Sequence, residues 1–169
     1  MAKNIIWTVI FVLIAAILQS TIFFRLAIYH AVPDLALCVL VFSAYVNGSM
    51  TGQLSGFFSG LFLDFLSAAP LGLNAFVRTL VGSLTGLMKG AFFLDIAILP
   101  MILCAAATLV KAVTLFLLHL LFADAVPSYN LFLPTLWVEL MLNTFSAPFL
   151  FALLKLFSPL LVERERRET

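Results

Sequence analysis

Charged side chains are scarce in this chain. Asp, Glu, Lys and Arg make up only 10% of its 169 residues, whereas hydrophobic residues make up 64%. A soluble globular domain is about a quarter charged and about half apolar. A water-soluble fold of this size could not bury so much apolar surface, so we expect an integral membrane protein whose outer surface faces lipid.

Cysteine and histidine are also rare, with two residues of each. Cys38 and Cys104 lie in apolar stretches and are expected to be buried thiols, which say nothing about the redox compartment. Because the chain has no paired Cys or His spacing, we predict no metal site and no cofactor. His119 is expected near a helix end, at the membrane interface. The net charge of +1 does not indicate a nucleic-acid partner.

Motifs of the common enzyme classes are missing from the sequence. It contains no Gly-rich phosphate loop, no nucleophile elbow and no His-Glu-x-x-His motif. The carboxylates expected within the membrane are single and form no recognisable dyad. We therefore predict that the protein is not an enzyme.

What the chain does contain is a series of six apolar stretches, at residues 5–23, 35–46, 54–66, 73–88, 96–122 and 133–161. A membrane-spanning helix needs roughly 20 apolar residues. The predicted fold is therefore an all-α polytopic bundle of six transmembrane helices, with five as the alternative. Residues 1–169 form one integral membrane domain with a short cytoplasmic tail at 163–169, and the first stretch is interpreted as a retained helix. Pro100 is a candidate break in the fifth stretch, and Pro148 lies in the sixth.

The basic residues predict the orientation of the bundle. Loops on the cytoplasmic side of bacterial membranes are enriched in Lys and Arg. Six helices place both termini on one side, together with Lys3, Lys89, Lys155, Arg164, Arg166 and Arg167. The opposite side receives only Arg25, His30, Asp34 and Asp124. We therefore predict a multi-pass membrane protein with both termini in the cytoplasm.

Glycines recur every four residues in the third stretch and again in the fourth. The first set is Gly52, Gly56 and Gly60, followed at the same spacing by Asp64; the second is Gly82, Gly86 and Gly90. On a helix this spacing forms one stripe without side chains, along which another backbone can approach closely. Two interpretations stay open: the two helices pack against each other, or the stripe is an interface for a partner or a second copy.

Four charged residues are expected to pair inside the membrane, because an isolated charge there is costly. A turn with Pro70 and Gly72 separates Asp64 from Arg78 symmetrically, which predicts an Asp64–Arg78 pair or one polar pocket lined by both. A weaker second pair joins Lys111 and Glu139. Its alternative is that Lys111 extends toward the membrane interface.

Three sequence elements occur in an order that resembles the MreD family, the rod-shape-determining membrane proteins of bacteria. They are Pro33-Asp34-Leu35 at a helix start, Gly52-x3-Gly56-x3-Gly60-x3-Asp64, and Pro70-Leu71-Gly72-Leu73-Asn74-Ala75-Phe76 followed by Gly82-x3-Gly86. Length and hydropathy also fit over nearly the whole chain. The family is distantly similar to the six-helix substrate-binding subunits of energy-coupling-factor transporters, which implies that fold.

This resemblance implies a location in the bacterial cytoplasmic (inner) membrane and a role in the cell-wall elongation machinery. The expected function is a non-catalytic scaffold that binds MreC, a single-span membrane protein, and so helps to control cell shape and peptidoglycan synthesis. RodA and a class-B penicillin-binding protein are further expected partners, with MreB indirect; homo-oligomerisation stays open. Candidate partner-binding positions are the glycine stripe and the helix start at Pro33-Asp34. The alternative function is a substrate-binding subunit of a small-molecule transporter.

Overall fold

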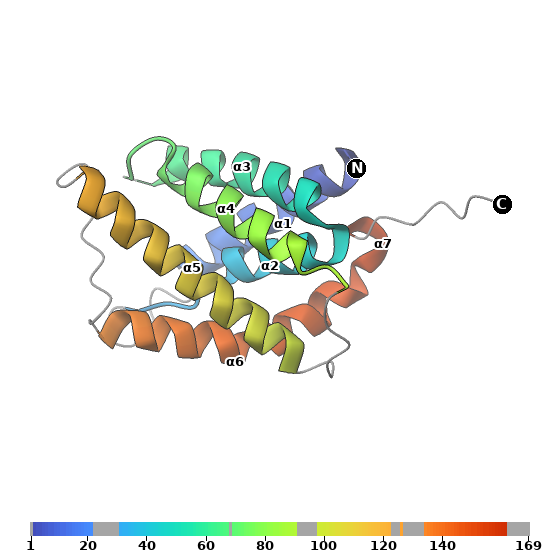
Figure 1. Cartoon of the computed structure of the whole chain (residues 1–169). Helices are drawn as coiled ribbons and strands as arrows, with labels where there is room; N and C mark the ends of the chain where they lie inside the picture. The colour runs from blue at the N-terminus through green and yellow to red at the C-terminus, as the bar shows by residue number, and fades with distance from the viewer. Residues whose placement is uncertain are drawn as a thin grey trace.

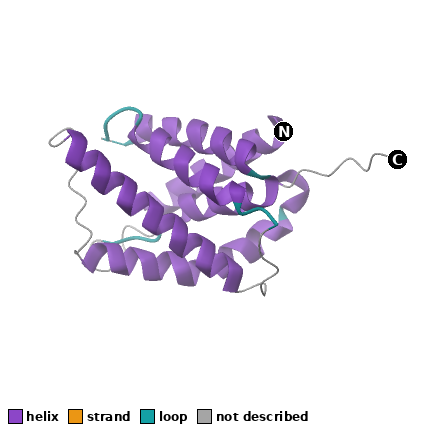
Figure 2. Cartoon of the chain, in the orientation of Figure 1, coloured by secondary structure: helices purple, strands orange, loops and turns teal. Residues whose placement is uncertain are grey.

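The computed structural model describes residues 2–21, 31–67, 69–90, 98–122, 126 and 134–161, and the elements found there are all helices (Figure 2). These are α1 (Ala2–Thr21), α2 (Leu35–Asn47), α3 (Ser49–Leu66), α4 (Leu73–Leu87), α5 (Ile98–Phe122), α6 (Pro134–Leu156) and the single turn α7 (Ser158–Leu161). The predicted all-α fold is confirmed for this part of the chain. The expectations for the tail at 163–169 and for Arg25, His30 and Asp124 lie outside the described residues.

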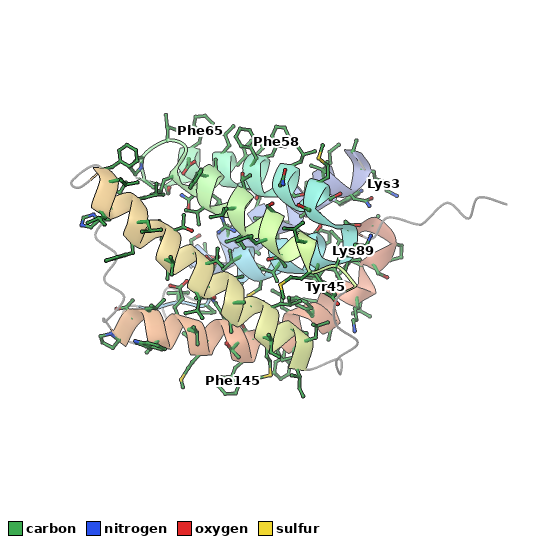
Figure 3. All side chains as sticks on the ribbon, in the orientation of Figure 1. Lys3, Tyr45, Phe58, Phe65, Lys89 and Phe145 are labelled. Atoms are coloured by element: carbon green, nitrogen blue, oxygen red, sulfur yellow. The ribbon has the colours of Figure 1, made fainter. Side chains whose placement is uncertain are left out.

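The long helices form one bundle in which α3 and α4 make an antiparallel hairpin (Figure 1). The start of α1, the end of α4 and α7 lie at one end of the bundle, and the turn between α3 and α4 lies at the other. Figure 3 shows Lys3 and Lys89 at the same end. This arrangement agrees with the clustering of basic residues expected from the sequence, while the side of the membrane that this end faces stays a prediction.

The helices differ in their ability to cross a bilayer. By length and composition, α1, α5 and α6 could each span a membrane. In contrast, α2 has 13 residues and α4 has 15. At 1.5 Å per residue α2 is about 20 Å long, shorter than the hydrocarbon core of about 30 Å. The structure thus supports a helical membrane protein, and the number of six full spans stays a prediction.

Three predicted boundaries need correction. The third helix begins at Ser49 and not at residue 54, because Gly48, at φ +99°, ends α2 and starts α3 with almost no loop. Pro100 does not break α5, since it lies in the first turn, where its missing N–H is not needed. The sixth stretch continues through Pro148 but is divided near Phe157, where α7 begins.

The core is built around α2, which contacts five other helices: α1, α3, α4, α5 and α6. Every residue from Ala36 to Ala44 is buried. Polar contacts also hold this helix: the Thr8 and Ser43 hydroxyls lie 2.6 Å apart, and the Asn47 side chain donates to the Leu161 carbonyl. Large apolar side chains instead cover the outside of the bundle, as expected for a surface in lipid; Phe149, for example, is 80% exposed.

Candidate functional site

The glycines of α3 and α4 form a backbone-to-backbone seam between the two helices. All five predicted packing glycines, Gly52, Gly56, Gly60, Gly82 and Gly86, are buried. A methyl group added at Gly52 would collide with the Gly82 carbonyl, and one at Gly56 would collide with the Arg78 carbonyl. The structure therefore matches the interpretation that the two helices pack on each other. Gly90 lies beyond α4, with open space around it, and is not part of this glycine seam.

Asp64 caps the start of α4 and does not pair with Arg78 as predicted. Its two carboxylate oxygens accept from the backbone N–H groups of Gly72, Asn74 and Ala75 at 2.9–3.1 Å, and from the Asn74 side chain. These N–H groups have no partner within the helix, so a carboxylate beside them is favourable. Gly72, at φ +94°, provides the left-handed turn that brings the chain back to Asp64. The symmetric position of Asp64 and Arg78 about the turn was thus misleading.

Arg78 instead contacts Asp34, at the start of α2. The Arg78 Nη2 to Asp34 Oδ1 distance is 3.2 Å, and the Lys111 Nζ to Asp34 Oδ2 distance is 2.7 Å. Lys111 also contacts Glu139 Oε1 at 2.6 Å. These four side chains, which we call the charged junction, connect the start of α2 to α4, α5 and α6. The expected Lys111–Glu139 pair is therefore present, as part of a larger group with Asp34 at its centre.

Neutral polar groups hold Asp34 in place. Its side chain caps α2 by accepting from the Leu37 N–H at 2.9 Å, and its own backbone N–H donates to Asn143 Oδ1 at 2.6 Å. The Asn143 amide in turn donates to the Thr108 hydroxyl at 2.9 Å. Asn143 and Thr108 are fully buried. Residues of α5 and α6 thus fix the backbone as well as the charge at the start of α2.

The charged junction is buried and balanced in charge. Side-chain exposure is 8% for Asp34 and Arg78, 10% for Glu139 and 20% for Lys111. Burying a charge costs several kcal/mol unless it is paired and hydrogen-bonded, and two cations with two carboxylates meet this requirement. Arg78 is engaged less fully than Lys111: within the described segments its Nη2 contacts one carboxylate oxygen, and its Nη1 has no hydrogen-bond partner there.

A cavity of about 380 Å³ lies beside the charged junction, between the ends of α1 and α3 and the start of α4. We call it the α1/α3/α4 cavity. Its polar lining residues are Gln19, Ser20, Asp34, Ser67, Asn74 and Arg78, and the rest of the wall is apolar. Among the residues that the structure describes, neither Gln19 Oε1 nor Arg78 Nη1 has a hydrogen-bond partner, and both atoms are buried. From the sequence, Asn74 and Arg78 were named separately and were not placed around one cavity with Gln19.

Other predicted polar positions have structural roles. Pro33 and Asp34 are buried, and Pro70 lies in the exposed turn before α4. Cys38 and Cys104 are buried free thiols, as expected. His119, in the last turn of α5, contacts the Val126 carbonyl at 2.8 Å. Within the described ranges, no group of three or more His, Cys, Asp or Glu residues could hold a metal ion.

Sequence reasoning missed the central place of Asp34, which it treated as a helix start and an outer-loop charge. One signal was available: an Asp directly before an apolar helix is a strong N-cap candidate, and its side chain is then held at the helix end. No comparable signal identifies Thr108, because its role depends on Asn143, 35 residues away in the chain.

Long apolar helices with a charge-paired interior define this chain as a helical membrane protein. Residues 1–157 match the family described as rod shape-determining protein MreD. This match covers most of the chain, which therefore belongs to the MreD family of rod-shape-determining membrane proteins. Neither the curated proteins nor the solved structures gave a match to the chain.

Proposed function

We propose that this chain is a non-catalytic scaffold of the bacterial cell-wall elongation complex. In this role it binds an MreC-like single-span protein in the cytoplasmic membrane and, through it, the enzymes of peptidoglycan synthesis. The family match over residues 1–157 is the observation that carries the proposal.

The interior of the bundle supports a scaffolding role. A scaffold has to present a partner with a surface of fixed shape, and the charged junction ties four elements together at defined positions. Each of its charges already contacts another charge within the chain. A reaction that used these side chains would first have to break the contacts that hold the helices in place.

The partner helix would contact the lipid-facing surface, because the two positions suggested by the sequence are buried. The packing glycines of each helix lie against the backbone at the other side of the α3–α4 seam, and Pro33 and Asp34 lie inside the bundle. Two lipid-facing surfaces are easily distinguished in Figure 3: Phe58 and Phe65 project outward from α3, and Phe145 projects from α6 on the opposite face. This geometry allows a test with the same probe on both faces.

The experiment is photocrosslinking in native membranes. A photoreactive phenylalanine analogue replaces Phe58, Phe65 or Phe145 singly in the full chain, and crosslinked partners are identified by mass spectrometry. The proposal expects a single-span protein with a large extracytoplasmic part, crosslinked from one face more strongly than from the other. Each variant is a control for the others, because all three residues are exposed phenylalanines.

The transporter alternative gives a different result in the same experiment. A substrate-binding subunit would crosslink to a transmembrane coupling subunit, and an ATPase module would copurify with the complex. The α1/α3/α4 cavity is the observation that favours this alternative. Recovery of an ATPase module with no wall-synthesis protein would contradict the scaffold proposal.

A further inference from the structure

Three exposed lysines lie at the end of the bundle that carries the start of α1, the end of α4 and α7 (Figure 1). Lys3 is in the first turn of α1, Lys89 follows α4 by two residues, and Lys155 is in the last turn of α6. We call these three residues the basic end. The ion pairs found within the described residues are those of the charged junction, which uses none of these lysines. Their positive charges are therefore open to a partner.

The carboxylates of the described residues do not neutralise the basic end. Asp64 caps α4 at the opposite end of the bundle, and Asp34 and Glu139 belong to the charged junction. In the sequence, residues 163–169 contain three arginines and three glutamates, so these side chains add no net charge. Within the described part of the chain, the positive charge of this end thus has no counterpart.

A hydrogen-bonded network holds two of the lysine-bearing segments together. The Asn4 side-chain amide donates to Asn47 Oδ1 at 3.3 Å, and the Asn47 amide donates to the Leu161 carbonyl at 2.7 Å. Asn4 directly follows Lys3, and Leu161 ends α7, which begins three residues after Lys155. The network therefore ties the start of α1 to the segment that follows α6, through the end of α2.

Lys89 lies beside the same network. Its Cδ would be 3.5 Å from a Cβ added at Gly48, the residue that directly follows Asn47. Figure 3 also shows Lys89 and Lys3 at the same end of the molecule. The three lysines are thus presented together by packed helices, and not scattered over the surface.

Each lysine has a large exposed apolar side chain within three residues of it. These neighbours are Ile6, Leu87 and Leu156, with exposed fractions of 58%, 70% and 75%. A lysine at a membrane surface can keep its methylene stem against apolar surface while its ammonium group reaches the lipid headgroups. A phosphate beside the ammonium group and an acyl chain along the apolar neighbour are two parts of one phospholipid. An acidic segment of a soluble protein would use the charge alone, so the apolar neighbours favour a lipid.

We infer that the basic end binds anionic phospholipids, whose phosphate groups accept hydrogen bonds from the ammonium groups of Lys3, Lys89 and Lys155. Basic side chains next to a membrane-spanning helix are attracted to anionic headgroups in this way. The opposite end of the bundle has no exposed Lys or Arg among its described residues. The lipid preference is therefore confined to one leaflet. This inference goes beyond the proposed scaffold function and does not depend on it.

The test uses the full chain purified in dodecyl maltoside, a detergent without charge or phosphate. Phosphatidylglycerol and phosphatidylcholine with the same acyl chains are titrated separately, and bound lipid is counted by native mass spectrometry. Both lipids contain a phosphate, but only phosphatidylglycerol has a net negative charge. We expect phosphatidylglycerol to bind more tightly, and the difference to shrink as the salt concentration is raised, because salt screens exposed charges.

Lysine substitutions test the residues of the basic end. Lys3→Gln, Lys89→Gln and Lys155→Gln should each weaken phosphatidylglycerol binding about fivefold, the factor that corresponds to about 1 kcal/mol for a lysine near an anionic surface. The triple Gln variant should lose the preference for phosphatidylglycerol over phosphatidylcholine. The triple Arg variant is the matched control, because it keeps all three charges and should keep the preference.

Three results of the lipid titrations would overturn the inference. They are equal binding of the two lipids by the unmodified chain, an unchanged preference in the triple Gln variant, and an equal loss of preference in the triple Arg variant. An octaglutamate peptide, titrated without added lipid, represents an acidic protein partner. Saturable, lysine-dependent binding of this peptide without any preference between the lipids would also overturn the inference and assign the basic end to an acidic protein.

Discussion

The glycine seam and the charged junction hold the same helix, α4, in two different ways. At the seam, α4 lies against α3, its neighbour in the sequence, with backbone directly on backbone. At the junction, one side chain of α4 reaches Asp34, 44 residues away along the chain. The seam is a repeated local contact between consecutive helices, whereas the junction joins elements that are distant in the sequence.

Substitutions in the two regions should also destabilise the protein in different ways. Close helix packing in membranes depends on many small van der Waals contacts, so damage at one glycine is partly absorbed by a shift of the helices. A buried ion cluster depends on each member, because removing one leaves another charge without a partner. The predictions that follow test this difference, from the largest expected effect to the smallest.

Replacing Asp34 with alanine should have the largest effect. The change leaves Arg78 and Lys111 without their shared carboxylate and removes the cap of α2. Breaking a buried charge pair costs about 3–5 kcal/mol, which should strongly reduce folded yield in membranes and stability in detergent unfolding titrations. Asp34→Asn keeps the size and one acceptor but not the charge, and should recover only part of the loss. If Asp34→Ala unfolded like an ordinary surface variant, the contrast between the two regions would fail.

Replacing Gly56 with alanine should have a smaller effect. The added methyl group meets the Arg78 backbone carbonyl, so α3 and α4 must move apart. Overpacking of this kind costs about 1–3 kcal/mol, measurable as a lower thermal unfolding temperature in detergent. Phe57→Leu, at the exposed neighbouring position, should change stability by less than about 0.5 kcal/mol. Equal effects of the two substitutions would show that the seam is not tightly packed.

Asp64→Ala tests the local cap that replaced the expected ion pair. It removes the acceptor for the first N–H groups of α4 but leaves no unpaired cation. The loss should be about 0.5–2 kcal/mol, the usual range for an N-cap, and so smaller than for Asp34→Ala. Asp64→Asn keeps one acceptor oxygen and should be intermediate. An effect of Asp64→Ala as large as that of Asp34→Ala would indicate that Asp64 does compensate a charge.

Thr108→Val addresses the neutral support of the charged junction and should have the smallest effect. The substitution preserves shape but removes the acceptor for the Asn143 amide, at a cost of about 1 kcal/mol. Thr114→Val on the same helix is a matched control, because both hydroxyls also donate to the carbonyl four residues earlier. When each substitution is combined with Asp34→Asn, only Thr108→Val should lower the stability of the protein further. Identical unfolding curves for the two variants would show that the hydrogen bond from Asn143 to Thr108 does not stabilise the protein.

The sequence predicted the glycine seam and misplaced the charges. Spacing of four residues puts Gly52, Gly56 and Gly60 on one face of any helix, and the short turn after Asp64 leaves α4 as the nearest neighbour. The pairing of Asp64 with Arg78 was also predicted from local spacing, because the two residues lie at equal distances from the turn and so at a similar depth in the membrane. Similar depth does not decide which way a side chain points, and Asp64 found closer donors in the backbone of its own turn.

The sequence by itself determined that this chain is a helical membrane protein, that its third and fourth helices each carry a glycine stripe, and that its residues resemble the MreD family. These properties follow from composition and from contacts between neighbouring segments. Only the tertiary structure decided that Asp34 would meet Arg78 and Lys111, and that Gln19 and Arg78 would line one cavity. Such contacts depend on how α1, α2, α4, α5 and α6 are arranged around each other, which no local spacing in the chain specifies.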